Sequence, residues 1–185
     1  MTTVLLDGRK LPHGDWEGDD FTPGARGHYF TCQDTAVGRM VAFATNGKVD
    51  RDGRVYRAAV QPPDPNGVSF QQLQPAVRKV AGKELIITDR WTWPQVLAHL
   101  KSAKGIVIDG LYSAIPRPFR YQARADFGHA IWFCYYSPAS GVRGWDPLNP
   151  DTTAYGRWYP LEVVKAFSQS WGNISAYVPL DPLGG

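Results

Sequence analysis

The sequence predicts an α+β fold in which an early helix, carrying a cysteine, packs on a mostly antiparallel sheet. Two helical patterns come first, over residues 32–45 and from residue 69, and extended runs concentrate late, between residues 128 and 178. Helices followed by strands are typical of the α+β class, whereas a parallel sheet needs strands and helices in regular alternation. The 185 residues suffice for one domain with a substantial core.

Three parts are expected along the chain. Residues 1–27 are rich in Gly, Asp and Pro, which predicts an irregular lead-in with a short strand at residues 4–6. Residues 28–178 are expected to form a single domain, and residues 179–185 a tail.

The first predicted helix covers residues 32–45 and ends at Asn46-Gly47, a common helix stop. Its apolar residues recur at helical spacing and define one face: Ala36, Val37, Met40, Val41 and Ala44. The Gly- and Pro-rich segment that follows predicts a loop, with a hairpin turn at Asp52-Gly53.

Two capping boxes predict the next helices. Ser69 is followed by Gln72, and Thr92 by Gln95, so each pair can satisfy backbone N–H groups at a helix start. Pro75 lies inside the first of these helices and would kink it or delay its start. Short buried strands are predicted at residues 84–88 and 105–110, before and after the helix that begins at Thr92.

The late part of the chain predicts a hairpin, a helix and a last strand. Residues 129–136 and 142–146 form the two strands of the hairpin, and residues 115–128 form a loop before it. Pro160 marks the start of a helix that runs to about residue 171, because proline is favoured in a first helical turn. Residues 174–178 are the last predicted strand.

Composition excludes several classes of function. The hydrophobic share is 43% and the charged share 20%, as in folded globular proteins. The net charge of +3, without a Lys/Arg block, does not indicate a nucleic-acid partner. No run approaches the roughly 18 apolar residues of a membrane span. The beginning of the sequence has no signal-peptide pattern, which predicts synthesis in the cytoplasm, with release at lysis or association with a virion as routes outward.

Cysteine and histidine usage excludes two further kinds of site. Cys32 and Cys134 are too few for a disulfide scaffold. They are also far apart, and the four histidines are dispersed, so the spacing of a zinc site is absent. No Gly-rich phosphate loop is present. We expect neither a metal nor a cofactor.

Cys32 stands where the first helical pattern begins. Unpaired N–H groups and the helix dipole at such a position favour the thiolate, the reactive form of cysteine. The ordinary alternative is a small buried hydrophobic residue.

His129 and Asp146 are the candidate partners of this thiol. His129 starts one strand of the predicted hairpin and Asp146 ends the other, so both lie at the same end of the sheet. Asp146 could then hold the imidazole in one orientation, as the third member of a catalytic triad does. The alternatives are a structural histidine and a turn residue ahead of Pro147.

These residues resemble the papain-like cysteine peptidases, in particular the branch that processes bacteriocin leaders at double-glycine sites, with its relatives in bacteria and phages. The resemblance lies in "TCQDTAVGRMVAFATNG", "TWPQVLAHLKSAKGIVIDG", "GHAIWFCYY" and "GWDPLNP", and it covers most of residues 28–172. It implies a papain-like fold with Cys32 as nucleophile, His129 as base and Asp146 as the orienting residue.

One departure from the family concerns the oxyanion hole. The family usually has a glutamine a few residues before the cysteine, and "GARGHYFT" contains none. The candidate replacements are His28 and Tyr29, which precede the cysteine, and Gln33, which follows it. Loss of one oxyanion donor costs about 2.7–4 kcal/mol of transition-state stabilisation.

Aromatic residues suggest where a substrate would bind. Trp145 is next to Asp146, where it could shield the histidine–aspartate bond or line a cleft. Tyr155 and Trp158 lie in a Gly-containing loop and are candidates for contacts with a sugar or peptide. Trp132 and Trp171 are expected in the core.

Two functions are consistent with these residues. The first is a cysteine peptidase or amidase that cleaves peptide bonds of bacterial peptidoglycan, as phage lysins and tail-associated wall hydrolases do. The second is a catalytically weak or inactive papain-like module of a phage virion or tail, with virion proteins as partners. The oxyanion donor is the feature that separates them.

Overall fold

The computed structural model describes residues 31–49, 53–61, 67–102, 104–122, 126–149 and 156–183, together with the backbone of residues 5–6 and 9–10. Its central feature is a six-stranded sheet in the order β3-β8-β4-β5-β6-β7, in which every neighbouring pair is antiparallel. The strands are β3 (Ile86–Ile87), β4 (Ile106–Leu111), β5 (Gly128–Ser137), β6 (Gly141–Trp145), β7 (Arg157–Tyr159) and β8 (Ser175–Tyr177). The predicted α+β class with an antiparallel sheet is confirmed.

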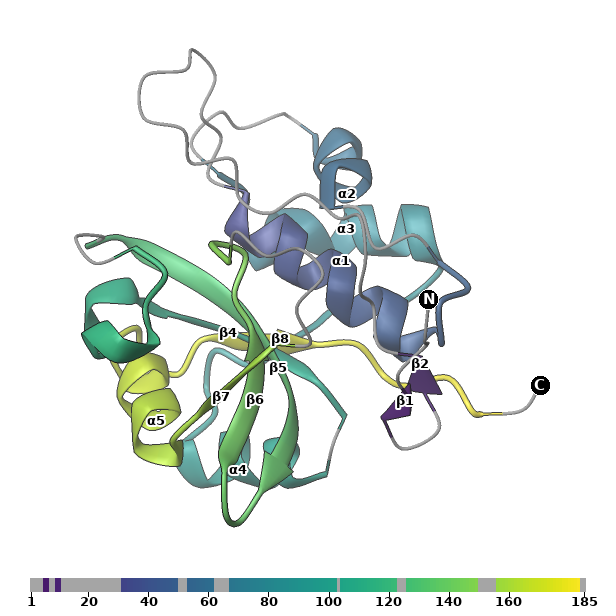
Figure 1. The fold of residues 1–185 in the computed structure, drawn as a ribbon. Coiled ribbons are helices and arrows are strands. Elements are labelled where there is room, and N and C mark those ends of the chain that lie inside the picture. The colour runs from purple at the N-terminus through teal and green to yellow at the C-terminus, as the bar shows by residue number, and fades with distance from the viewer. Residues whose placement is uncertain are drawn as a thin grey trace.

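Helices cover both faces of the sheet. In Figure 1, α1, α2 and α3 lie on one side, and α4 and α5 lie on the other. The helices are α1 (Cys32–Ala44), α2 (Gly53–Ala59), α3 (Phe70–Ala81), α4 (Trp93–Lys101) and α5 (Leu161–Gln169). A separate two-stranded sheet, β1 (Leu5–Leu6) with β2 (Arg9–Lys10), lies in the segment expected as an irregular lead-in.

Strand alternation divides the core between the two faces. Along β4, Val107 packs in the cluster that includes α1, whereas Ile106 and Ile108 pack in the cluster that includes α4 and α5. Successive side chains of a strand point to opposite faces, so one strand contributes to both clusters. Trp132 on β5 is fully buried on the α1 face, as predicted.

Helix α1 is buried on nearly every side. Twelve of its thirteen residues are buried, and Gln33 is the exception. The sequence predicted one apolar face, which packs on the sheet; α2 and α3 cover much of the rest. A helix enclosed in this way holds its first residue, Cys32, in a fixed place relative to the sheet.

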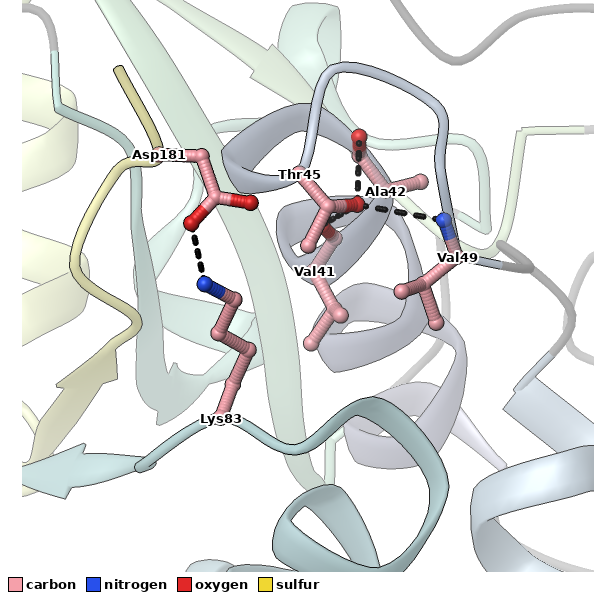
Figure 2. A network of polar contacts seen from close by, with 6 residues as sticks. All are labelled: Val41, Ala42, Thr45, Val49, Lys83 and Asp181. Atoms are coloured by element: carbon pink, nitrogen blue, oxygen red, sulfur yellow. Dashed lines mark hydrogen bonds and ion pairs between the residues drawn. The ribbon is translucent and has the colours of Figure 1, made fainter. Parts of the chain in front are cut away.

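The end of α1 is closed by Thr45, as Figure 2 shows. Its hydroxyl donates to the carbonyl oxygens of Val41, at 2.8 Å, and Ala42, at 3.3 Å. The same oxygen accepts from the backbone N–H of Val49 at 3.3 Å. Asn46 and Gly47 then have positive φ angles of 53° and 77°, which end the helix where the sequence predicted.

The segment after β8 is attached to this end of α1. The backbone N–H of Asp181 donates to the carbonyl oxygen of Ala44 at 2.8 Å. Its carboxylate forms an ion pair with Lys83, which follows α3 (Figure 2). A residue expected as part of a tail, Asp181, therefore contacts α1 and the turn after α3.

Both predicted capping boxes are present, at Ser69 with Gln72 and at Thr92 with Gln95. The hairpin turn predicted at residues 52–53 is wrong, because Gly53 begins α2. A Cβ atom at Gly53 would lie 2.6 Å from the backbone nitrogen of Thr35, so glycine permits the close approach of two helices here.

Two further segments differ from the loops expected. Residues 157–159 lie in a predicted loop but form β7, which pairs with β6 at the edge of the sheet. Between β4 and β5 the chain makes two short 3₁₀ turns; Tyr112–Ala114 precedes the loop predicted over residues 115–128, and Arg117–Phe119 lies inside it. Elements of three residues are too short to show a hydrophobic period.

Candidate active site

The three residues predicted for catalysis come from three different elements. Cys32 is the first residue of α1, His129 is the second residue of β5, and Asp146 directly follows β6. Pairing of β5 with β6, in which Trp132 faces Trp145, brings His129 and Asp146 to the same end of the sheet.

His129 and Asp146 form a buried pair. The ring nitrogen Nε2 of His129 lies 2.7 Å from Oδ1 of Asp146, and both side chains are 0% exposed. The other ring nitrogen, Nδ1, is buried and has no hydrogen-bond partner among the described residues. Because the carboxylate engages Nε2, it holds the imidazole so that Nδ1 is available for proton exchange.

Asp146 is itself held by two further hydrogen bonds. Its Oδ1 also accepts from the backbone N–H of Leu148 at 2.9 Å, in the turn that follows β6. Its Oδ2 accepts from the hydroxyl of Tyr112, also at 2.9 Å. Burial, together with the neighbouring Asp146, raises the pKa of the Tyr112 hydroxyl, so this group stays protonated and donates. Hydrogen bonds therefore hold both carboxylate oxygens of Asp146 in place.

Aromatic rings shield this pair from water. The ring of Tyr112 meets the imidazole of His129 edge-on, with centroids 4.8 Å apart, and Phe127 does the same at 6.0 Å. An apolar surrounding strengthens the hydrogen bond between His129 and Asp146 and limits competition by solvent.

Cys32 and His129 line one pocket of about 470 Å³. The pocket is formed by residues of α1, α3, β4 and β5, the segments beside them and the turn after α5: Cys32, Gln33, Gly67, Val68, Ser69, Gln72, Asp109, Gly110, Phe127, Gly128, His129 and Trp171. A thiol at a helix N-terminus and an imidazole therefore border the same space, as the predicted nucleophile and base require.

The two cysteines occupy different environments. Cys32 is 8% exposed at the pocket, whereas Cys134 is 0% exposed in β5. Neither takes part in a disulfide. Only Cys32 is placed where a small reagent or substrate can approach.

Gln33 and Asp109 form a second polar pair in this pocket. The amide Nε2 of Gln33 donates to Oδ2 of Asp109 at 2.5 Å, which joins the first turn of α1 to β4. Oδ1 of Asp109 is buried without a hydrogen-bond partner among the described residues. Burial raises the pKa of the Asp109 carboxyl to about 8, and the hydrogen bond from Gln33 opposes part of this rise. At neutral pH the carboxyl is therefore mostly protonated.

Neither Trp145 nor Trp158, the two predicted substrate-binding residues that the structure describes, lines the pocket. Trp145 is 2% exposed and packs on Trp132 with centroids 4.5 Å apart, so it belongs to the core and not to the pocket lining. Trp158 is half-buried on β7 beside Tyr135, away from the pocket lining. The prediction that Trp171 is in the core is wrong, since it is 44% exposed and borders the pocket.

Three other candidates lie outside the described residues: His28, Tyr29 and Tyr155. Of the predicted oxyanion residues, Gln33 is the one that the structure describes, and it borders the pocket.

Sequence reasoning missed Asp109, Tyr112 and the position of Trp171. Asp109 is a lone acid inside the apolar strand "GIVIDG", and that exception to the pattern was an available signal. Nothing local marks Tyr112, because its partner Asp146 is 34 residues away.

Within the described part of the chain, no group of three His, Cys, Asp or Glu side chains could hold a metal ion. The helices described there include none that is long and apolar enough to span a membrane.

Comparison with known proteins identifies a shared fold. No family model and no curated protein matches the chain. Among solved structures, the chain is similar to the crystal structure described as a "putative C39-like peptidase" from Bacillus anthracis. The TM-score is 0.58 and the sequence identity 14%, over 83% of this chain and 90% of that one. The six-stranded antiparallel sheet and the helix that begins at Cys32 therefore belong to a fold shared with that C39-like protein.

Proposed function

We propose that this protein is a cysteine peptidase or amidase with Cys32 as nucleophile, His129 as general base and acid, and Asp146 as the residue that orients His129. One observation carries the proposal. The pair of His129 and Asp146 uses Nε2 and leaves Nδ1 without a described partner, in a pocket that a helix-initiating cysteine also borders. The shared fold with a C39-like protein supports the same reaction class.

The reaction follows from these positions. Transfer of the thiol proton to Nδ1 of His129 gives a thiolate, whose sulfur bonds to the carbonyl carbon of the substrate. The resulting oxyanion collapses, the C–N bond breaks, and the leaving amine takes the proton from the imidazolium. Water, losing a proton to His129, then attacks the thioester. The C–S bond breaks, which releases a carboxylic acid and restores the thiol.

We further propose peptide bonds of bacterial peptidoglycan as the substrate. The pocket combines an exposed indole, Trp171, with hydrogen-bonding groups of Ser69 and Gln72. An aromatic platform beside polar groups suits a branched peptide attached to a sugar. Lysis of the producing cell or carriage on a virion would bring such an enzyme to the wall.

Hydrolysis of wall preparations tests the function. Purified protein should release free amino groups from peptidoglycan, and Cys32→Ala and Cys32→Ser should both abolish this release. His129→Ala should lower turnover by roughly a thousandfold, and Asp146→Asn by less, because it disturbs orientation and not proton transfer itself. Cys134→Ala, at the other thiol, serves as the matched control and should retain activity.

The same experiment can favour the alternative function, a papain-like module without useful catalysis. If diverse wall preparations show no Cys32-dependent release while Cys32→Ala folds and assembles normally, the protein is better described as a papain-like module of a virion or tail. Retention of activity in Cys32→Ala would rule out the thiol mechanism directly.

A further inference from the structure

Gln33 occupies an unusual position in α1. It directly follows the candidate nucleophile, and it is the one residue of this helix that is not buried. Its side chain borders the pocket, and its amide nitrogen donates to Asp109 on β4. The hydrogen bond to Asp109 restricts the rotamers of the Gln33 side chain, whereas the side chain of a glutamine on the open surface is free to rotate.

That constraint matters for stabilising an oxyanion. The amide nitrogen of glutamine carries two N–H groups, and the contact with Asp109 uses one of them. The other can donate to a ligand oxygen. A donor contributes most when it is fixed before the reaction, because no reorganisation is then needed as charge develops. Fixing a flexible glutamine also removes rotamer freedom that would otherwise be lost on binding.

Asp109 is suited to hold this amide without opposing the oxyanion. It is 8% exposed, and its Oδ2 accepts from Gln33. Because burial raises the pKa of its carboxyl to about 8, it carries little negative charge at neutral pH. A fully charged carboxylate at this position would repel the negative charge that forms on the substrate oxygen.

We propose that the Gln33 side chain is the oxyanion donor of this pocket and that Asp109 is the positioning residue that holds it. This inference rests on the proposed function, since an oxyanion forms only if Cys32 attacks a carbonyl. It assigns a donor after the cysteine to a chain that has no glutamine in the eight residues before it, "GARGHYFT".

Two reagents that react with the same thiol separate donor function from thiol activation. p-Nitrophenyl acetate acylates Cys32 through a tetrahedral oxyanion, with p-nitrophenolate as leaving group, whereas iodoacetamide alkylates it by direct displacement of iodide and forms no oxyanion. Gln33→Ala should slow acylation by roughly a hundredfold and leave the alkylation rate within about twofold, with both rates measured at Cys32 by peptide mass spectrometry. Gln71→Ala, on the exposed face of α3 and outside the pocket lining, is the control glutamine and should change neither rate.

Variants of Asp109 test the positioning role. Asp109→Asn keeps an oxygen that can accept from Gln33, so the acylation rate should stay within about threefold of the wild-type rate. Asp109→Ala should slow acylation about tenfold and leave alkylation unchanged. The double variant Gln33→Ala with Asp109→Ala should be no slower than Gln33→Ala alone, because Asp109 acts only through Gln33.

The outcomes distinguish this inference from the proposed function. Equal slowing of acylation and alkylation in Gln33→Ala, or no slowing of either, overturns the inference. Additive losses in the double variant overturn the positioning role of Asp109. Failure of the proposed function has a different signature: alkylation of Cys32 would be indifferent to His129→Ala in the wild-type background, whatever Gln33 does.

Discussion

Asp146 accepts three hydrogen bonds, from a ring nitrogen, a backbone N–H and a phenol, all within a buried environment. The phenol comes from Tyr112, whose ring also contacts His129. One tyrosine therefore restrains both members of the pair. Its hydroxyl additionally accepts from the backbone N–H of Tyr121 at 2.8 Å, which anchors the chain after the second 3₁₀ turn.

Tyr112→Phe should reduce turnover without weakening substrate binding. Removing the hydroxyl deletes a hydrogen bond to a carboxylate, a contact worth about 1.5–3 kcal/mol, and leaves Asp146 freer to rotate. We expect kcat to fall about tenfold with KM unchanged, and the thermal midpoint to drop. Steady-state kinetics and thermal unfolding measure the two effects.

Tyr159→Phe is the matched control for that change. Tyr159 is also fully buried, but its hydroxyl has no hydrogen-bond partner among the described residues. Its removal should leave kcat unchanged and should not lower stability. Equal effects of the two substitutions would show that Tyr112 contributes only packing.

At the scale of elements, α2 supports the first turn of α1. Gly53 lies against the backbone of Asp34 and Thr35, and the carboxylate of Asp34 forms an ion pair with Arg57 at 3.5 Å. Asp34 is 1% exposed, so this contact joins the two helices in the interior. The turn that carries Cys32 is thus positioned by a helix that has no residue in the pocket.

Gly53→Ala should separate these helices. The added Cβ would lie 2.6–2.7 Å from backbone atoms of α1, which cannot yield as a flexible side chain could. Overpacking of this kind costs about 1–3 kcal/mol, so chemical denaturation should reveal a loss of that size. Alkylation of Cys32 should also slow. Ala58→Ser, at an exposed position of the same helix, is the control and should affect neither measurement. If Gly53→Ala changed neither the stability nor the alkylation rate, α2 would not constrain α1.

Sequence patterns predicted the elements whose signals are local. Capping boxes at Ser69 and Thr92 were readable because both partners lie within one turn. Gly53 was misread as a turn residue, since a glycine required by close helix approach looks the same in sequence as one required by backbone conformation.

At the site, contacts between residues far apart in the sequence could not be predicted from local patterns. His129 and Asp146 were predictable together because one hairpin carries both. The contact between Gln33 and Asp109 spans 76 residues and depends on how α1 packs on β4. No periodicity encodes that contact, so the sequence left Gln33 as one of three candidates for the oxyanion donor and gave no reason to single it out.

For the whole molecule, the buried Asp109 makes stability depend on pH. Its pKa is raised from 3.8 to about 8 in the folded state, so between these values the folded protein holds a proton that the unfolded chain releases. The contribution of this group to stability is complete below about pH 4 and is lost as pH rises toward 8. A difference of one bound proton corresponds to a loss of about 1.4 kcal/mol per pH unit.

Asp109→Asn should therefore flatten the pH profile of stability. The amide cannot ionise, so the variant and the wild type should have similar stability near pH 4, and the variant should become progressively the more stable of the two up to pH 8. Cys32 and His129 also border the pocket, but both are present in the two proteins, so the difference between the profiles isolates Asp109. Denaturant unfolding at successive pH values measures this difference. Asp89→Asn, in an exposed turn, is the control, and its pH profile of stability should be parallel to that of the wild type. Parallel profiles for Asp109→Asn as well would mean that Asp109 is ionised in the folded protein, and its negative charge would then oppose an oxyanion in the pocket.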